Sequence, residues 1–257
     1  MKPLKVRGRT LNREGQVLIC TPLVARTADA LEAELAAILP QRPDLIEWRV
    51  DFFSEIHQSR HVVEVAHNLR KVAGNIPIIF TRRATHEGGE PALLNEDVVV
   101  ALYETMCGSG AVDIIDYELS QTTENRERLR AASRAHDVAM IMSYHNFNST
   151  PARAVLVEKI TEAARQGADI AKVAVMPQVP RDVLVLLEAT LEASQRADIP
   201  VITMSMGTIG AMSRLCGGLF GSAMTFASGE HSSAPGQIPI EQLRVALATL
   251  AQASSGR

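Results

Sequence analysis

Residues 168–176 read ADIAKVAVM, an apolar run that is interrupted by the lysine at position 172. Successive side chains of an extended strand alternate between two faces, so Lys172 shares a face with Ile170, Ala174 and Met176. A buried ammonium without a partner is costly, and chains normally keep lysine at the surface. Lys172 therefore either reaches past its neighbours to solvent or is kept inside the protein for chemistry.

This run is one of eight short apolar runs along the chain. The others lie at residues 16–23, 44–51, 76–83, 112–119, 138–145, 199–206 and 222–228. Stretches rich in Ala, Glu and Arg separate them, and one of these, residues 151–167, begins with Pro and ends with Gly, as helices often do. Strands that alternate with helices predict βαβ units and a parallel sheet.

The number of these units favours one particular α/β fold. Eight of them in 257 residues suit a closed (β/α)₈ TIM barrel. An open doubly wound sheet is the alternative, but no G-x-G-x-x-G motif follows the first run. We expect residues 4–17 to form an N-terminal β-hairpin that turns at residues 12–15 and covers the barrel floor. No linker or low-complexity tract divides the chain, so residues 1–257 are expected to form a single barrel domain.

The composition excludes several classes of protein. The chain is 46% hydrophobic and 21% charged with a net charge of −3, and it has no basic stripe that would favour nucleic acid. No apolar run reaches the roughly 18 residues of a membrane span, and the N-terminus lacks the apolar core of a signal peptide. The three cysteines are far apart and form no C-x-x-C pair, which favours a reduced, cytoplasmic setting.

In TIM barrels active sites form at the C-terminal ends of the strands, so the position of a polar residue within its run is informative. Glu47, Arg49 and Asp51 alternate with apolar residues and therefore share one face of their strand. Both faces of a parallel sheet are normally covered, so these charges indicate a polar site inside the barrel. A half-solvated strand is the alternative.

Two interpretations of Lys172 remain open. The lysine pairs with a buried carboxylate such as Glu47 for structural reasons, or it forms a Schiff base with a ketone. A Schiff base needs a neutral amine, whereas a free lysine titrates at about 10.4. We expect burial and nearby cations to keep the amine uncharged. His145 ends the neighbouring run and suits a general acid and base, although a histidine satisfied by loop backbone is the alternative.

Three loops after the strands carry the remaining candidates. Residues 81–90, TRRATHEGGE, contain Arg83 and Glu87, and Glu87 is a candidate partner for an imidazole. Residues 205–215, SMGTIGAMSRL, combine a helix start with Arg214, which suits a carboxylate or phosphate unless the arginine lies at the surface. Residues 227–239, ASGEHSSAPGQIP, have the Gly/Ser/Pro composition of a mobile lid.

Six segments of the chain together resemble one known family. They are IEWRVD at 46–51, FTRRATHEGG at 80–89, MSYHNF at 142–147, ADIAKVAVMPQ at 168–178, SMGTIGAMSRL at 205–215 and SAPGQI at 233–238. In this order they resemble the type I 3-dehydroquinate dehydratases of the shikimate pathway, from the first strand to the last loop. The resemblance implies a (β/α)₈ barrel, usually a homodimer, that converts 3-dehydroquinate to 3-dehydroshikimate by syn elimination without a metal or organic cofactor.

The same resemblance implies roles for ten residues. Lys172 would be the Schiff-base lysine, His145 the proton shuttle, and Glu87 the residue that orients the imidazole. Seven residues would contact the substrate, namely Thr21, Glu47, Arg49, Arg83, Arg214, Ser233 and Gln237. Among these, Arg214 would hold the substrate carboxylate, and Thr21 would stand where relatives often carry serine.

Three other functions compete with this interpretation. A class I aldolase would share the barrel and Lys172, but it would need a phosphate cradle after the seventh and eighth strands. A metal-dependent barrel would draw its ligands from Glu47, Asp51, Asp116, Glu118 and His145. An inactive binding or scaffold domain would keep the barrel alone, which the joint presence of lysine, base and arginine disfavours.

Overall fold

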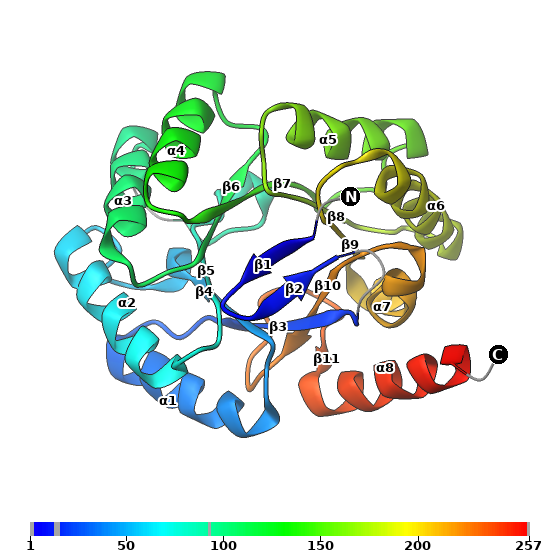
Figure 1. Ribbon diagram of the computed structural model, residues 1–257, viewed down its shortest axis with the longest axis horizontal. Helices are drawn as coiled ribbons and strands as arrows, with labels where there is room; N and C mark the ends of the chain where they lie inside the picture. Colours follow the sequence, from blue (N-terminus) through cyan, green and yellow to red (C-terminus); the bar gives the residue numbers. More distant parts are fainter. Residues whose placement is uncertain (1–2, 13–15, 92–93, 256–257) are drawn as a thin grey trace.

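The computed structural model describes residues 3–12, 16–91 and 94–255, and helices surround a central ring of parallel strands (Figure 1). The strands of this ring are β3 (Leu18–Leu23), β4 (Leu45–Arg49), β5 (Ile78–Thr81), β6 (Ile114–Glu118), β7 (Ala139–Asn146), β8 (Ile170–Val175), β9 (Val201–Ser205) and β10 (Met224–Ser228). The helices are α1 (Ala28–Ile38), α2 (Ser59–Ala73), α3 (Glu96–Ser109), α4 (Thr123–Ala135), α5 (Arg153–Arg165), α6 (Pro180–Arg196), α7 (Gly207–Cys216) and α8 (Ile240–Ser255). Shorter elements are the 3₁₀ turns η1 (Leu39–Gln41), η2 (Val50–Phe52), η3 (Thr85–Glu87) and η4 (Gly217–Phe220), and strand β11 (Ile238–Pro239).

The strands close into a barrel. Each strand from β3 to β8 pairs in parallel with the next, and β10 pairs with β3. A bridge between Val201 and Ser222 joins β9 to β10, where the backbone N–H of Ala223 donates to Val201 O at 2.8 Å. Each of the eight apolar runs identified in the sequence coincides with one of these strands. The predicted TIM barrel is therefore confirmed.

Local sequence signals start several of the helices. The side chain of Asn95 accepts the backbone N–H of Val98 at 2.9 Å at the start of α3, and Thr122 caps α4 through the N–H of Asn125 at 3.3 Å. Pro180 occupies the first turn of α6, where its missing N–H has no intrahelical partner to lose. These caps fix where each connection leaves a strand and enters a helix.

Period-two alternation divides each strand between the helices and the barrel interior. The outward residues pack against the helices in one large apolar cluster that includes Trp48, Phe80, Tyr117 and Val173. The first inward residues form a continuous apolar layer, made of Leu18, Leu45, Ile79, Ile114, Ile141, Ile170, Ile202 and Met224. The lower third of the barrel is therefore a packed core, and any polar site has to lie above it.

The N-terminal hairpin is present, but its turn is not where the sequence predicted it. Strands β1 (Leu4–Val6) and β2 (Arg9–Leu11) are joined by Arg7 and Gly8, both with positive φ, at 42° and 77°. A two-residue turn of this kind matches the twist of paired strands and needs left-handed backbone, which Gly8 adopts without strain. Residues 13–15 of the predicted turn lie outside the described residues.

The hairpin covers the barrel floor as expected. In Figure 1 it crosses the centre of the ring of strands. Val6 and fully buried Leu11 join the apolar layer formed by the first inward residues. A salt bridge between Arg7 and Asp113, which precedes β6, ties the turn to the barrel.

None of the helices in the described part of the chain is long and apolar enough to cross a membrane.

Candidate active site

Directly above the apolar floor, the next inward residue of each strand is mostly polar. This second layer consists of Cys20, Glu47, Thr81, Asp116, Ser143, Lys172, Met204 and Phe226. The third step along the strands brings in Arg49, Arg83, Glu118 and His145 near the barrel mouth. The strand period thus gathers the charges of distant segments at the C-terminal end of the barrel, where TIM-barrel active sites form.

Lys172 lies inside the barrel and is paired with two carboxylates. Its side chain is 5% exposed, and Nζ lies 2.9 Å from Asp116 Oδ2 and 3.4 Å from Glu47 Oε1. The amine also lies 4.6 Å from the centre of the Phe226 ring. We expected burial and nearby cations to keep this amine uncharged. Its nearest charged neighbours are instead the anions Asp116 and Glu47, and Glu47 is the partner that the alternative interpretation named.

Asp116 is held in place by a buried arginine. Arg83 donates through Nη2 to Asp116 Oδ1 at 2.7 Å and through Nη1 to Glu118 Oε1 at 3.0 Å, while Ser143 Oγ donates to Asp116 Oδ1 at 2.6 Å. Burial alone would raise the pKa of Asp116, but Arg83 and Lys172 outweigh it and hold that pKa below its usual range. Burial likewise opposes the charge on Arg83, yet Asp116 and Glu118 raise its pKa above the ordinary value.

His145 is oriented by Glu87. Glu87 Oε2 accepts the backbone N–H of His145 at 3.0 Å and lies 2.9 Å from its Nδ1. A carboxylate oxygen accepts, so Nδ1 carries the ring proton and Nε2 keeps a free lone pair. Ser120 Oγ donates to the other carboxylate oxygen at 2.6 Å. Burial, followed by the positive charges of Arg83 and Lys172, holds the pKa of His145 well below its usual range, so the imidazole is neutral at pH 7.

The register of neighbouring strands places His145 one step above the lysine. Ser143 pairs with Lys172 across β7 and β8, and His145 pairs with Ala174. Because side chains two residues apart on a strand share a face, His145 lies on the cavity side nearer the mouth. A substrate carbon attached to Nζ would extend toward this imidazole.

Arg49 is fixed by a residue of the turn that follows β4. It donates through Nε and Nη2 to the two oxygens of Asp51, at 2.8 and 2.7 Å. Asp51 lies in η2, and its carboxylate also accepts the backbone N–H groups of Arg83 at 3.2 Å and Glu90 at 3.1 Å. One carboxylate therefore joins Arg49 to the loop that carries Arg83 and Glu87.

Arg214 is a buried cation of a different kind. It is 1% exposed in α7, and it donates to the carbonyl oxygens of Phe226 at 3.3 Å and Pro235 at 3.2 Å. Its Nε has no hydrogen-bond partner, and no carboxylate within the described residues pairs with it. Burial lowers the pKa of Arg214 to about 10. A buried, unpaired guanidinium at a barrel mouth is suited to an anionic group of a ligand.

The lid lies over the site. Ser233 and Gln237 hydrogen-bond to each other, with the Ser233 N–H on Gln237 Oε1 at 2.9 Å and Gln237 Nε2 on Ser233 Oγ at 3.1 Å. The N–H of Gly207 at the start of α7 donates to Pro235 O at 3.0 Å. The cavity beneath measures about 40 Å³, far below the roughly 300 Å³ of small-molecule pockets. The lid has to move to admit a ring-sized ligand.

Most of the predicted site residues meet at this cavity. Its lining includes Glu47, Arg49, Arg83, Glu87, His145, Lys172, Ser233 and Gln237. Arg214 lies behind the wall, in contact with the lining residues Met204 and Phe226. The remaining lining is largely apolar and includes Phe147, Met204 and Met206.

Thr21 does not join them. Cys20 packs with the interior cluster, so Thr21, the next residue of β3, faces the opposite side of the strand. A Cβ atom added to Gly229 would lie 3.3 Å from Thr21 Cγ2 and 2.7 Å from Ile38 Cγ2, which places Thr21 beside helix α1. The expected contact between its hydroxyl and a substrate stays a prediction, and the orientation of Thr21 does not support it.

Sequence reasoning gave too little weight to four residues of the site. Asp116 and Asp51 entered as ligands of an alternative metal site, Asp51 also as one of three charges on a strand, and Ser143 and Phe226 were not singled out. Asp116 carried a usable signal, because it is the third residue of β6 and repeats the pattern of Glu47, the third residue of β4. No group of three or more His, Cys, Asp or Glu side chains comes together as a metal site in residues 3–12, 16–91 and 94–255.

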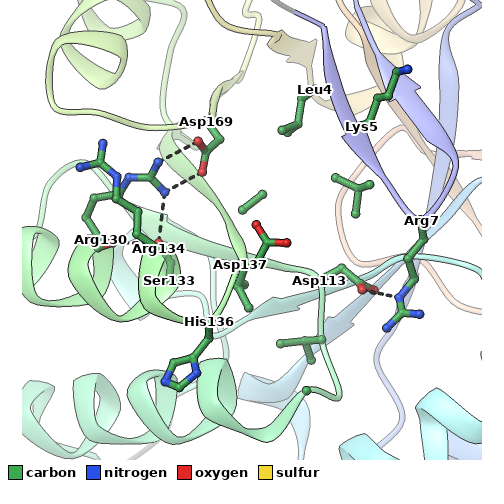
Figure 2. A pocket seen from close by; sticks show the side chains of 15 residues that line it. Leu4, Lys5, Arg7, Asp113, Arg130, Ser133, Arg134, His136, Asp137 and Asp169 are labelled. Carbon is green, nitrogen blue, oxygen red and sulfur yellow. Dashed lines mark hydrogen bonds and ion pairs between the residues drawn. The ribbon is translucent and has the colours of Figure 1, made fainter.

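A larger cavity of about 480 Å³ lies at the other end of the barrel, between the hairpin and α4. Figure 2 shows its charged walls, where Arg130 pairs with Asp169 and Arg7 pairs with Asp113. The two aspartates stand before the first residues of β8 and β6, at the end of the strands that in TIM barrels serves stability. The mouth cavity is therefore the candidate active site.

Comparison with known proteins gives a consistent result. Residues 19–254 match the family model described as type I 3-dehydroquinase. The 3-dehydroquinate dehydratase of Albidiferax ferrireducens is 50% identical over 252 residues, which cover 98% of this chain and 96% of that protein. The enzyme of the same name from Geobacillus thermodenitrificans is 53% identical over 232 residues and 90% of each chain.

Solved structures agree with the sequence matches. The crystal structure of 3-dehydroquinate dehydratase from Geobacillus kaustophilus superimposes with a TM-score of 0.95 at 46% identity, covering 98% of this chain and 97% of that one. The type I enzyme from Clostridium difficile, with covalently modified comenic acid, gives a TM-score of 0.94 at 39% identity over 98% of both chains.

Proposed function

The chain belongs to the type I 3-dehydroquinase family and is a 3-dehydroquinate dehydratase, a hydro-lyase of the shikimate pathway, and we propose that it acts through a Schiff base on Lys172. The observation that carries this proposal is a buried primary amine at the base of the mouth cavity, with a neutral, oriented imidazole one step above it. The Clostridium difficile relative with covalently modified comenic acid supports covalent chemistry in this family.

In the proposed reaction the freed amine of Lys172 attacks the ketone of 3-dehydroquinate, and water leaves. The resulting iminium draws electrons from the adjacent carbon and so acidifies its C–H bond. His145 Nε2 removes that proton, while Glu87 holds the ring through Nδ1 and stabilises the imidazolium. The enamine then expels the β-hydroxyl, His145 returns its proton to the leaving oxygen on the same face, and hydrolysis of the imine releases 3-dehydroshikimate.

The remaining residues hold the ring in place. Arg214 has unused donors and no protein anion, so it is assigned to the substrate carboxylate. Glu47 and Arg49 line the cavity and contact the ring hydroxyls, as does Arg83 where its donors are not occupied. Ser233 and Gln237 exchange their mutual hydrogen bonds for bonds to the substrate. No metal or organic cofactor enters this scheme.

Borohydride reduction in the presence of 3-dehydroquinate, followed by peptide mass mapping, tests the proposal. A single adduct on Lys172 is expected, and Lys172→Ala should abolish both adduct and turnover. His145→Ala should still form the adduct but lose elimination by a factor of roughly 10² to 10⁴. An adduct on another side chain, or full activity of Lys172→Ala, would refute the mechanism.

The same measurements separate this function from a class I aldolase. An aldolase would be trapped by its own ketone, and it would not generate the absorbance of a conjugated enone from 3-dehydroquinate. The unpaired Arg214 behind the cavity wall and the Ser/Gln lid over the cavity suit a carboxylate and hydroxyls.

We also propose that the chain forms a homodimer. Helices α6 and α7 and the turn η4 pack together and expose Leu184, Leu191, Met212 and Leu219, each between 44% and 61% exposed. An exposed apolar patch of this kind is typical of a protein interface. Light scattering should give about twice the 27.9 kDa chain mass, and Leu184→Glu should shift it toward the monomer.

A cytoplasmic location is proposed from the cysteines. Cys20, Cys107 and Cys216 are all free thiols, and the first two are buried. Burial raises the pKa of Cys107 to about 12, so the thiol is unreactive. Fractionation of the source cells with activity measurement tests the location.

A further inference from the structure

The two carboxylates beside the Lys172 amine have different surroundings. Asp116 uses Oδ2 for the amine at 2.9 Å, and its Oδ1 accepts from Arg83 and Ser143. Glu47 lies at 3.4 Å from the amine through Oε1, which also accepts from Thr81 Oγ1 at 3.0 Å. Both hydrogen bonds that Glu47 makes in the described part of the chain use Oε1, and Glu47 lines the cavity.

From this difference we infer that Glu47 removes the proton from the Lys172 ammonium and later returns it to the oxygen that leaves, whereas Asp116 remains ionised as the counter-ion of the nitrogen. The inference rests on the Schiff-base function proposed above. It assigns to Glu47 a proton-transfer role in addition to substrate contact, and to Asp116 a positioning role that the sequence did not indicate.

Asp116 is a poor proton acceptor because its lone pairs are already engaged. Arg83 lies at 2.7 Å and Ser143 at 2.6 Å from Oδ1, and both would lose a strong acceptor if Asp116 were protonated. The nitrogen of Lys172 is positive before attack, as an ammonium, and positive again in the iminium. A fixed anion 2.9 Å from that nitrogen stabilises both states without having to move.

His145 is less suited to this first step. Its Nδ1 is occupied by Glu87, and the strand register places it beside Ala174 rather than beside Lys172. In the described residues the amine contacts Glu47 and Asp116 but not the imidazole. Since the two bases act at different levels of the cavity, Glu47 serves the nitrogen and the ketone oxygen, and His145 serves the carbon next to the imine and the β-hydroxyl.

Lys172 and Glu47 account for every proton that is transferred during imine formation. The ammonium gives one proton to Glu47, and the neutral amine forms the C–N bond with the ketone carbon. A second N–H proton passes to the alkoxide and gives a carbinolamine. Protonated Glu47 then donates to the carbinolamine hydroxyl, the C–O bond breaks, and one water leaves. Lys172 ends as a protonated imine, and Glu47 is again a carboxylate.

The test measures imine formation alone, as the rate at which borohydride traps 3-dehydroshikimate on the enzyme between pH 5 and 10. This ketone is the product, so trapping does not require elimination. Glu47→Gln should slow trapping at pH 7 by about 10²-fold or more, because the ammonium has lost its proton acceptor. Asp116→Asn keeps that acceptor, so trapping at pH 7 should fall less than in Glu47→Gln.

Asp169→Asn is the control, since Asp169 is a carboxylate that pairs with Arg130 at the other end of the barrel and does not contact Lys172. Its trapping profile should keep the wild-type midpoint. If Glu47→Gln does not fold, Thr81→Val removes the donor to Glu47 Oε1 and should move the acid limb of trapping to higher pH.

Several results would overturn the inference. They are a wild-type profile for Glu47→Gln, a greater loss of trapping in Asp116→Asn than in Glu47→Gln, or a loss in the Asp169→Asn control equal to that of Glu47→Gln. These outcomes differ from failure of the proposed function itself, in which the wild-type enzyme gives no adduct on Lys172.

Discussion

Replacing Arg214 by methionine should make the protein more stable and the enzyme worse. Burial lowers the pKa of Arg214 from its usual value to about 10. At pH 7 the group is charged in both folded and unfolded chains, so a shift of this size opposes folding by about 3 kcal/mol. The sign follows from the direction of the shift, because a base whose pKa is lower in the folded state lowers the free energy of unfolding at every pH below that pKa. This cost disappears only as the pH rises from about 10 toward the pKa of arginine in the unfolded chain.

Part of this cost is recovered by hydrogen bonds that methionine cannot make. Arg214 donates to the carbonyl oxygens of Phe226 and Pro235 at 3.3 and 3.2 Å, and each such bond contributes about 1 kcal/mol. The net expectation for Arg214→Met is a gain of about 1 kcal/mol in the free energy of unfolding. Urea titration followed by circular dichroism, without substrate at pH 7, measures it.

The same substitution should impair substrate binding. Removing one partner of a buried charge pair costs about 2 to 5 kcal/mol, so kcat/KM for 3-dehydroquinate should fall at least about 30-fold. Arg128→Met is the control, because Arg128 forms an exposed ion pair with Glu104 and should change neither quantity much. A less stable Arg214→Met enzyme with an unchanged KM would refute the assignment of this arginine to the substrate carboxylate.

Three further predictions concern the base and the lid. Glu87→Gln keeps the shape of the Nδ1 contact but removes the charge behind His145, so kcat should fall about 10- to 100-fold with little change in KM. Gly236→Ala should raise KM, because the new Cβ would lie 2.2 Å from Gly207 O and hold the lid away from α7. Gly74→Ala is the control, because Gly74 also has a positive φ but lies in open space, and this variant should leave KM unchanged. Because the pKa of His145 is held well below 6.5, the acid limb of kcat that belongs to this base should lie below pH 6.5, and an acid limb above pH 7 would contradict it.

The barrel was predictable because its signal is repeated in every strand. Side chains that alternate with a period of two, on a strand whose two faces are both covered, distinguish a parallel strand from a helix. The β8 sequence around Lys172 is one example. The hairpin turn was predicted wrongly because Asn and Gly at residues 12–15 resemble a turn by composition. The turn actually forms at Arg7 and Gly8, where cross-strand pairing of Val6 with Arg9 decides the position.

The site was predictable in part for the same reason. Position at a strand's C-terminal end identified Lys172 and His145 as candidates, and the structure brings both to the cavity. The pairing of Lys172 with Asp116 depends on how far β6, β7 and β8 are displaced along one another, which no single strand encodes. The direction in which Thr21 points depends on a related feature, since a shift of one residue along β3 exchanges the interior face for the helix face.

The apolar plug formed by the hairpin also determines how water travels through each turnover. Below Lys172 the described interior is filled by aliphatic side chains, including Leu11 and Ile170, with no polar path toward the hairpin end. The water molecule that is released when the imine forms has to leave past the lid or stay beside the reacting carbons. If it stays, the same water molecule can hydrolyse the imine after dehydration, and the enzyme would not need to admit a water molecule from outside.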